Sequence, residues 1–414
     1  MMEYNDIVNY FEDNLELAYR DGHIELNKSS LKVSAIRRFI NGRWIIASCQ
    51  GCDVNELRPD ELITVGDSPT YNELLDTELY VGRISLGALD RDPKDLIKAA
   101  ADVCNELKGA NVIRCEFIIN IRNYRKVIER DVGVASEEKV VIELLAGVIS
   151  RGLRYGYGGV HTALVTNLSN VGEGVIDKLL RRAYEKSIAS SKAKALNPVF
   201  IGRHQLLLRP EVTAALIHEL SHLLEATAVN RIPIGRRIGP HEVEVIDDPY
   251  NSSSPTIRVF DDEGVPTIKR KLIEDGVVID YHHTRLTAKQ LDSRAGSSYG
   301  LYHPPIPYHT TLVMGAGDWR DDELLRETRS GFVVEGVIKA ETEGNYIRIV
   351  PEYTLYIDGG EVRDRFIVNE VKIPLSKLMT ISAIGRIRDL RVSYEKGYLV
   401  SELAPAVRIE GYIG

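Results

Sequence analysis

The pattern of hydrophobic and polar positions in the first third of the chain predicts a mixture of helices and strands. Apolar residues recur every three or four positions in 6–20, and Gly22 follows, so we predict a helix there. The stretches 34–40 and 43–48 flank Asn41-Gly42, a dipeptide suited to the positive φ angles of a tight turn, and predict a β-hairpin. A second helix is expected between Asp92 as its N-cap and Gly109 as its stop.

After Gly109 the pattern becomes typical of strands, in the runs 112–121, 124–130 and 139–149. The glycine-rich stretch 154–160 lacks both the GxGxxG spacing and the lysine of a phosphate-binding loop, so we interpret it as a flexible strand end. A charged helix is expected over 173–195, and its small polar residues near 187–194 favour a domain connection there.

The second half of the chain is predicted to be mainly β. A strand over 198–208 leads into a helix that begins at Pro210 and extends to near Asn230. Hairpins are expected at 269–274 with 277–281, and at 353–357 with 362–368, and a late helix is expected over 374–384. We therefore predict an α+β protein with an N-terminal α/β domain, residues 1–190, and a β-rich C-terminal domain, residues 191–414, which carries the helix after Pro210.

Length and composition agree with two ordinary globular domains. The chain has 414 residues, of which 44% are hydrophobic. Its net charge of −8 includes no basic block, which argues against a surface for nucleic acid or for an anionic membrane. No apolar run is long enough to cross a bilayer, and the start lacks the pattern of a signal peptide, so we expect a cytoplasmic protein.

The four cysteines lie in the first third of the chain, at positions 49, 52, 104 and 115. This is not the pattern of a secreted domain held together by disulfides. The CxxC spacing of Cys49 and Cys52 would suit metal or redox chemistry, but no second CxxC follows, so we interpret it as structural.

One segment indicates a specific chemistry. His218-Glu219-Leu220-Ser221-His222 is an HExxH string inside the helix predicted after Pro210. On a helix, residues four apart lie on the same face, so both imidazoles can reach one metal ion while Glu219 stands beside it as a general base. Two histidines at this spacing also occur in ordinary cores, but a glutamate buried between them would then need a partner, which a metal ion supplies.

Several strings of the second half resemble the TldD/PmbA metallopeptidases, a family long described as modulators of DNA gyrase. These strings are GRHQLLLRP (202–210), ALIHELSHLLE (215–225), VEVIDDP (243–249), FDDEGVP (260–266), LIEDGV (272–277) and YHHTRLT (281–287). The resemblance implies an N-terminal α/β domain, a C-terminal β-rich domain that binds Zn²⁺, and a two-chain assembly, homodimer or heterodimer, whose channel admits unfolded peptides. In the family, often only one subunit of a pair holds metal.

The chain departs from the family pattern in two ways. The family string is HExxxH, with one more residue between the histidines, and the family's third zinc ligand is a cysteine near the C-terminus, where 386–414 contains none. Either another residue completes the site, or metal binding is weakened or lost.

The candidates for a third ligand all follow the motif in the sequence. Glu242 is the first choice, because it lies twenty residues after His222 and directly before a predicted strand, and the neighbouring His241 is the second. Glu225 is better placed to orient His222 than to bind metal. His282 and His283 either line the cleft or are ordinary histidines.

Two functions follow from the sequence. The first is a zinc metallopeptidase in which His218 and His222 hold the metal and Glu219 moves the proton. The second is a non-catalytic partner subunit of a TldD/TldE-like assembly that keeps the fold without the chemistry. Zinc content separates the two functions.

Overall fold

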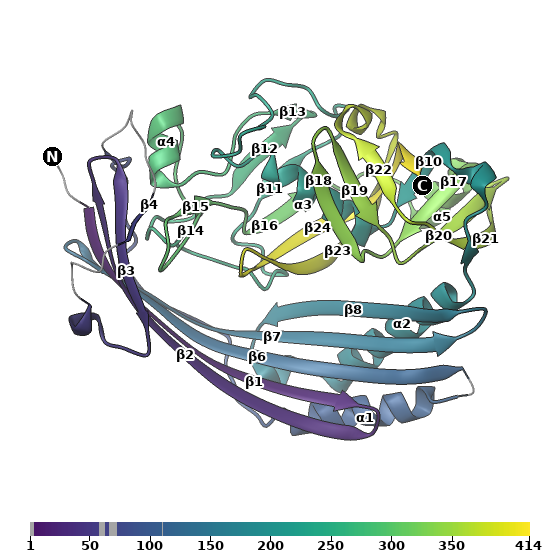
Figure 1. Ribbon diagram of the computed structural model, residues 1–414, viewed down its shortest axis with the longest axis horizontal. Helices are drawn as coiled ribbons and strands as arrows, with labels where there is room; N and C mark the ends of the chain where they lie inside the picture. The colour runs from purple at the N-terminus through teal and green to yellow at the C-terminus, as the bar shows by residue number, and fades with distance from the viewer. Residues whose placement is uncertain (1–3, 58–62, 66–72, 110) are drawn as a thin grey trace.

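The computed structural model describes residues 4–57, 63–65, 73–109 and 111–414. Two large β-sheets dominate it, one built from the N-terminal part of the chain and one from the C-terminal part, and five α-helices accompany them (Figure 1). The predicted α+β class is confirmed. The domain boundary predicted at residue 190 falls at the end of the connecting helix α2 (Glu173–Ser191) and stays a prediction.

The first sheet is long and largely antiparallel, with the order β4-β3-β2-β1-β6-β7-β5 and with β8 paired to β7. Its strands are β1 (Tyr4–Arg20), β2 (His23–Ile40), β3 (Arg43–Gln50), β4 (Ile63–Val65), β5 (Gly82–Leu86), β6 (Val112–Arg130), β7 (Gly133–Arg151) and β8 (Tyr155–Val165). The hairpin predicted around Asn41-Gly42 is present, in β2 and β3. The runs predicted at 112–121 and 124–130 form one continuous strand, β6.

The helix predicted over 6–20 is wrong, because this segment is the strand β1. One face of β1 lies toward the C-terminal half of the chain, where Val8 packs with Phe260 and Leu301, and this face includes polar residues. Asp6 is 1% exposed and pairs with Arg37, which also donates from Nη1 to the Gly300 carbonyl oxygen at 2.7 Å. A polar position that is buried by a partner far away in the sequence breaks the apolar alternation of a strand, and the remaining apolar residues then resemble a helical pattern.

Two helices cover the other face of the first sheet (Figure 1). α1 (Lys94–Leu107) follows Asp92, whose Oδ1 accepts the Lys94 N–H at 3.0 Å, and it packs against β6. α2 packs against β7 and β8. The core between helices and sheet includes Leu96, Ile97, Phe117, Ile119, Leu144 and Leu180.

The glycine-rich stretch 154–160 is part of β8 rather than a loop end. A Cβ atom on Gly158 would lie 2.1 Å from the carbonyl oxygen of Ala183, and one on Gly156 would lie 2.2 Å from the backbone nitrogen of Ser191, both on α2. These glycines therefore let α2 lie directly on β8, and their role is close packing rather than flexibility.

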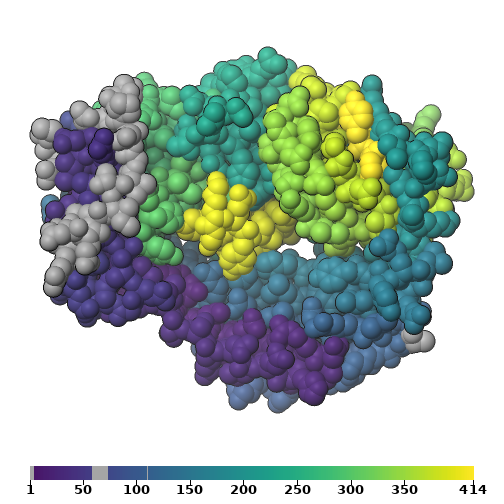
Figure 2. Space-filling view, viewed as in Figure 1, coloured from purple at the N-terminus to yellow at the C-terminus, as the bar shows by residue number. Residues whose placement is uncertain are grey.

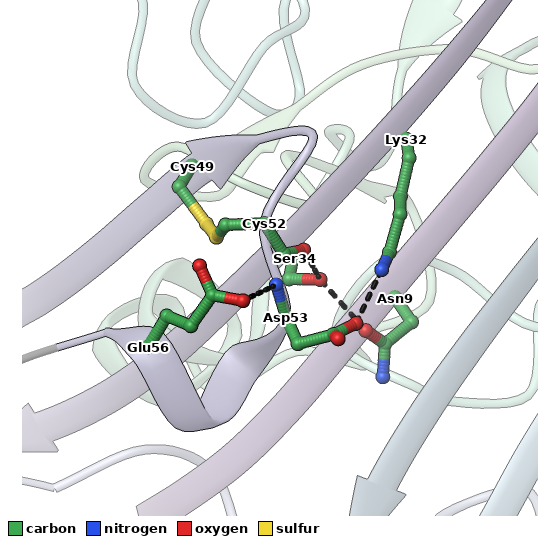
Figure 3. Close-up of a disulfide and its surroundings, with 7 residues drawn as sticks. All are labelled: Asn9, Lys32, Ser34, Cys49, Cys52, Asp53 and Glu56. Carbon is green, nitrogen blue, oxygen red and sulfur yellow. Dashed lines mark hydrogen bonds and ion pairs between the residues drawn. A yellow bond between two sulfur atoms is a disulfide. The ribbon is translucent and has the colours of Figure 1, made fainter.

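The four cysteines form two disulfides, Cys49–Cys52 and Cys104–Cys115, which the sequence analysis did not expect. The first links the end of β3 to the segment before Asp53, whose carboxylate pairs with Lys32 (Figure 3). The second joins α1 to β6, and both of its residues are fully buried. The structural interpretation of Cys49 and Cys52 stays a prediction.

The second sheet has fourteen strands of mixed direction, with the path β13-β12-β11-β16-β24-β10-β17-β20-β21-β9 and a branch through β22, β19 and β18. Its strands are β9 (Lys194–Ala195), β10 (Gly202–Leu208), β11 (Val245–Asp247), β12 (Arg270–Glu274), β13 (Val277–Val278), β16 (Thr311–Met314), β17 (Ser330–Glu335), β18 (Lys339–Glu343), β19 (Tyr346–Val350), β20 (Tyr353–Asp358), β21 (Glu361–Ile367), β22 (Val371–Pro374), β23 (Ala383–Glu395) and β24 (Tyr398–Ile413). A small separate sheet contains β14 (Ser298–Tyr299) and β15 (Ile306–Pro307).

Three helices belong to this half: α3 (Pro210–His222), α4 (Arg285–Leu291) and α5 (Asp321–Thr328). α3 packs against β24, β23, β18 and β19, and its apolar residues enter the largest core of the protein. Both hairpins predicted in this half are present. The helix predicted over 374–384 is a single 3₁₀ segment, Leu375–Thr380, and residues from Ala383 onward form β23. Among the described residues, no helix is both long and apolar enough to span a membrane.

Candidate metal centre

The HExxH motif lies on the last turns of α3. The helix begins at Pro210, as predicted, but ends at His222 instead of extending to near Asn230. It ends because the following backbone pairs with another segment, where the Leu224 carbonyl oxygen accepts the His282 N–H at 2.9 Å. The motif therefore lies at the C-terminal end of the helix, where the helix dipole favours a cation.

A β-hairpin brings a carboxylate to the two histidines. β23 and β24 are joined by Lys396-Gly397, which both have positive φ, and this turn places Glu395 at the end of β23. Oε2 of Glu395 lies 2.5 Å from Nε2 of His218 and 3.1 Å from Nε2 of His222. The hairpin extends between the second sheet and the first (Figure 1), and Figure 2 shows its residues, in yellow, above the first sheet.

Two further carboxylates contact the other nitrogen of each ring. Oε1 of Glu402 lies 2.7 Å from Nδ1 of His218, and Oε1 of Glu225 lies 2.8 Å from Nδ1 of His222. The predicted contact between Glu225 and His222 is therefore present. A carboxylate at Nδ1 accepts the proton of that nitrogen, so Nε2 is the nitrogen that faces Glu395 and that a metal ion could bind in place of its proton. Both imidazoles are thus oriented with Nε2 toward the hairpin.

The charges of these groups are set by burial and by their neighbours. Burial raises the pKa of Glu402, but Arg391 and His218 outweigh it and hold the pKa well below its ordinary value. Burial also raises the pKa of Glu395, but hydrogen bonds from His218 and His222 outweigh burial and hold this pKa well below its ordinary value. Burial lowers the pKa of His222, but its two carboxylate partners outweigh burial and raise the pKa to about 9. The pocket therefore favours positive charge at the position of the rings.

Glu219 lies beside the histidines and has its own hydrogen-bond partner. It is 8% exposed, and its Oε2 accepts the hydroxyl of Thr342, on β18, at 3.0 Å. His218, Glu219 and His222 each offer a ligand atom, and these atoms lie within 4.8 Å of one another. The structure therefore brings together the three motif residues that the sequence predicted as a site.

A second cluster supports His218 from the interior. His309 and Glu402 form, with His218, another group of potential donors within 4.8 Å of one another. Oε1 of Glu402 contacts both rings, at 2.7 Å and 3.3 Å, and Ser221 lies 3.2 Å from Nδ1 of His309. Burial lowers the pKa of His309 to about 4, so this imidazole is neutral at pH 7. The cluster orients His218 and is itself enclosed.

The other candidates named from the sequence lie elsewhere. Glu242 is exposed, and among the residues that the structure describes it belongs to neither donor group. The side chain of His241 is 75% exposed and lies 2.9 Å from Asp275. His282 and His283 are fully buried, so they are not surface histidines. The structure thus places Glu395, rather than Glu242, next to the motif.

Sequence reasoning missed Glu395, Glu402 and His309. The segment 386–414 contains no cysteine, and none of its glutamates belongs to a metal-binding motif of recognisable spacing. The signal that was available is Lys396-Gly397 between two alternating stretches, which is typical of a hairpin. A hairpin prediction would have placed Glu395 beside a turn, although no pattern indicates which helix that turn contacts.

The donor set fits a divalent metal ion. Two imidazole nitrogens and a carboxylate oxygen converge at the C-terminal end of a helix, and each ring is fixed by a carboxylate on its other nitrogen. An HExxH helix with a buried glutamate beside such a donor set is typical of the metallopeptidase class of protein.

Comparison with known proteins identifies the family. The model of the PmbA/TldA metallopeptidase C-terminal domain matches residues 201–412. A metalloprotease of Archaeoglobus fulgidus is 28% identical over 395 residues, which cover 88% of this chain and 87% of that protein. The metalloprotease MJ0996 of Methanocaldococcus jannaschii is 28% identical over 238 residues, 54% of this chain and 52% of the relative, so this match spans about half of the relative's length.

The fold agrees with this result. The crystal structure of TldE from Thermococcus kodakarensis superposes with a TM-score of 0.78 at 14% sequence identity and covers 99% of this chain and 96% of that one. The chain belongs to the TldD/PmbA metallopeptidase family, as the sequence resemblance implied.

Proposed function

We propose that the protein is a zinc-dependent metallopeptidase that hydrolyses unfolded or short peptides. The observation that carries the proposal is the donor group of His218, Glu219 and His222. Both imidazole rings of this group present Nε2 to the carboxylate of Glu395. Comparison with known proteins shows that the chain belongs to a metallopeptidase family.

The residues have separate roles in this mechanism. His218 and His222 would hold Zn²⁺ through Nε2, and Glu402 and Glu225 keep the two rings in that orientation. Zn²⁺, when bound, supplies the Lewis acidity that polarises the scissile carbonyl. Glu219 takes the proton of the attacking water and passes it to the leaving amine, while Thr342 fixes its carboxylate.

Two features support an extended peptide as the substrate. β18, which carries Thr342, pairs with β19 and has no second strand partner among the described residues. Such an edge can add a peptide as a further strand. Beside the hairpin tip, a cavity of about 270 Å³ lies between the two sheets, lined by tyrosines that include Tyr10, Tyr124 and Tyr398. Aromatic faces and hydroxyls suit a polypeptide of varied sequence.

The test is the Glu219→Gln variant, which keeps the shape of the side chain and removes the base. We expect cleavage of unstructured peptides to fall by about 10²–10⁴-fold, because general acid–base catalysis contributes that much, with zinc content unchanged. Glu361→Gln, at an exposed hairpin end, is the matched control and should behave like the parent. Cleavage by Glu219→Gln at the parent rate would remove this mechanism.

The second candidate is a non-catalytic partner subunit of a TldD/TldE-like assembly. It is supported by the absence of any cysteine after Cys115. The purified chain would then contain well below one zinc per protein after growth in zinc-rich medium, and Glu219→Gln would change nothing.

The setting in the cell is also a proposal. We propose a cytoplasmic protein that pairs with itself or with a related chain and does not bind nucleic acid or membranes. Sedimentation of the purified chain, alone and mixed with a related chain, distinguishes a homodimer from a heterodimer.

A further inference from the structure

We propose that Glu395 is the third protein ligand of the metal, so that two histidines and a glutamate from the β23–β24 hairpin complete the site. This inference rests on the proposed function, because it assigns the residue that closes the same metal centre. It starts from one contact: a single oxygen, Oε2 of Glu395, touches Nε2 of both His218 and His222.

The spacing of these atoms suits shared coordination. Ligand atoms about 2.0–2.1 Å from a tetrahedral zinc ion lie about 3.3 Å apart. The oxygen of Glu395 lies 2.5 Å from one nitrogen and 3.1 Å from the other. Both contacts are made at Nε2, the nitrogen that the carboxylates at Nδ1 leave available. The three atoms therefore face the same point and need only small shifts to surround an ion.

The other carboxylates of the pocket are engaged elsewhere. Glu402 and Glu225 contact the histidines at Nδ1, on the side away from this point, and each also binds a cation, Arg391 and Lys396 respectively. Among the described carboxylates, Glu395 is the one that contacts Nε2 of both rings. Glu395 is therefore the carboxylate placed to bind the metal directly.

The position of the hairpin also leaves room for substrate. The side chain of Glu395 is 33% exposed, whereas those of His218 and Glu402 are 5% and 0% exposed. A ligand at the edge of the pocket closes the site on one side and leaves it open toward solvent, as catalytic zinc sites with three protein ligands require. Lys396, next to Glu395 in the turn, donates to Oε1 of Glu225 at 2.8 Å and fastens the hairpin tip to the motif helix.

The first experiment measures zinc affinity by competition with a chelator, on the full chain. Glu395→Gln and Glu395→Ala should weaken zinc binding by more than about 100-fold, beyond the 10–100-fold that the loss of an orienting carboxylate causes. Glu361→Gln is the control and should bind zinc like the parent. Circular dichroism of each variant verifies the fold.

The second experiment places a thiolate at the same position. In the Glu395→Cys variant loaded with Co²⁺, a ligand at position 395 produces sulfur-to-cobalt charge-transfer absorption in the near ultraviolet, a signal that requires no activity. The four native cysteines are paired in disulfides in the N-terminal part, so they do not contribute to this signal. Glu361→Cys controls for the added thiol and should show no such band.

The outcomes separate this inference from the proposed function. If the parent binds one zinc through His218 and His222, but Glu395→Gln and Glu395→Ala bind it equally well and Glu395→Cys gives no band, the third ligand is another residue and the metallopeptidase proposal stands. If the parent binds no zinc, both proposals fail. A charge-transfer band together with weakened binding in the other two variants supports Glu395 as the ligand.

Discussion

Replacing Arg37 by methionine removes the cation from a fully buried ion pair within the first sheet, on the face that contacts Gly300 of the C-terminal half. Arg37 donates from Nε and Nη2 to Asp6, at 2.8 Å and 2.5 Å, and both side chains are 0% exposed. Nη1 of Arg37 donates to the Gly300 carbonyl oxygen at 2.7 Å. The variant leaves Asp6 with the hydroxyl of Tyr4, at 2.6 Å, and without an ion pair to any other cation that the structure describes.

The expected loss of stability follows from the complete burial of both side chains. Removing one partner of a buried ion pair costs about 3–5 kcal/mol, because the remaining charge stays desolvated. For a chain of this length unfolding as one unit, that loss lowers Tm by about 3–6 °C. The double variant Asp6→Leu/Arg37→Met should regain much of the loss, since an apolar pair of similar volume replaces a buried ion pair with little cost.

The assay is urea unfolding followed by circular dichroism, with Arg83→Met as the matched control. Arg83 pairs with Glu138 at 2.7 Å in the same sheet, but its side chain is 64% exposed and screened by solvent, so we expect its loss to leave the stability nearly unchanged. If Arg37→Met is no less stable than Arg83→Met, the buried pair does not stabilise the protein more than an exposed one, which would refute the prediction.

Three further predictions concern the site, the pH dependence and the packing. Burial, only partly opposed by Lys186, raises the pKa of Glu352 to about 7. Its contribution to stability is therefore complete below its unfolded pKa of about 4.5 and is lost as the pH rises toward 7. Urea unfolding of Glu352→Gln should show a flatter pH dependence in that window, and an unchanged profile would contradict the assignment. Glu402→Gln should weaken zinc binding by about 10–100-fold in chelator competition, because it loses the carboxylate at Nδ1 of the first motif histidine, and equal affinity would refute that role. Gly158→Ala should destabilise the protein by about 1–3 kcal/mol, because the new Cβ would lie 2.1 Å from a backbone oxygen of α2, whereas Gly174→Ala, with open space around it, should not destabilise; equal thermal melts of the two variants would exclude the packing argument.

Local patterns in the sequence determined several elements in both halves of the chain. Pro210 starts the motif helix, Asn41-Gly42 turns a hairpin, and the HExxH spacing places both histidines on one helical face. Each of these depends on residues within a few positions of one another, so the sequence alone contains the information.

Tertiary structure decided the rest. Residues 6–20 form a strand because they pair with β2 and β6 on both sides, and because one face of the strand packs against distant residues, as in the contact of Tyr10 with Tyr302. The helix α3 ends at His222 because its continuation pairs with the segment at His282. Glu395 and Glu402 meet the histidines because the β23–β24 hairpin packs across the motif helix. Contacts of this kind join residues about 60 to 290 positions apart, and no local periodicity records them.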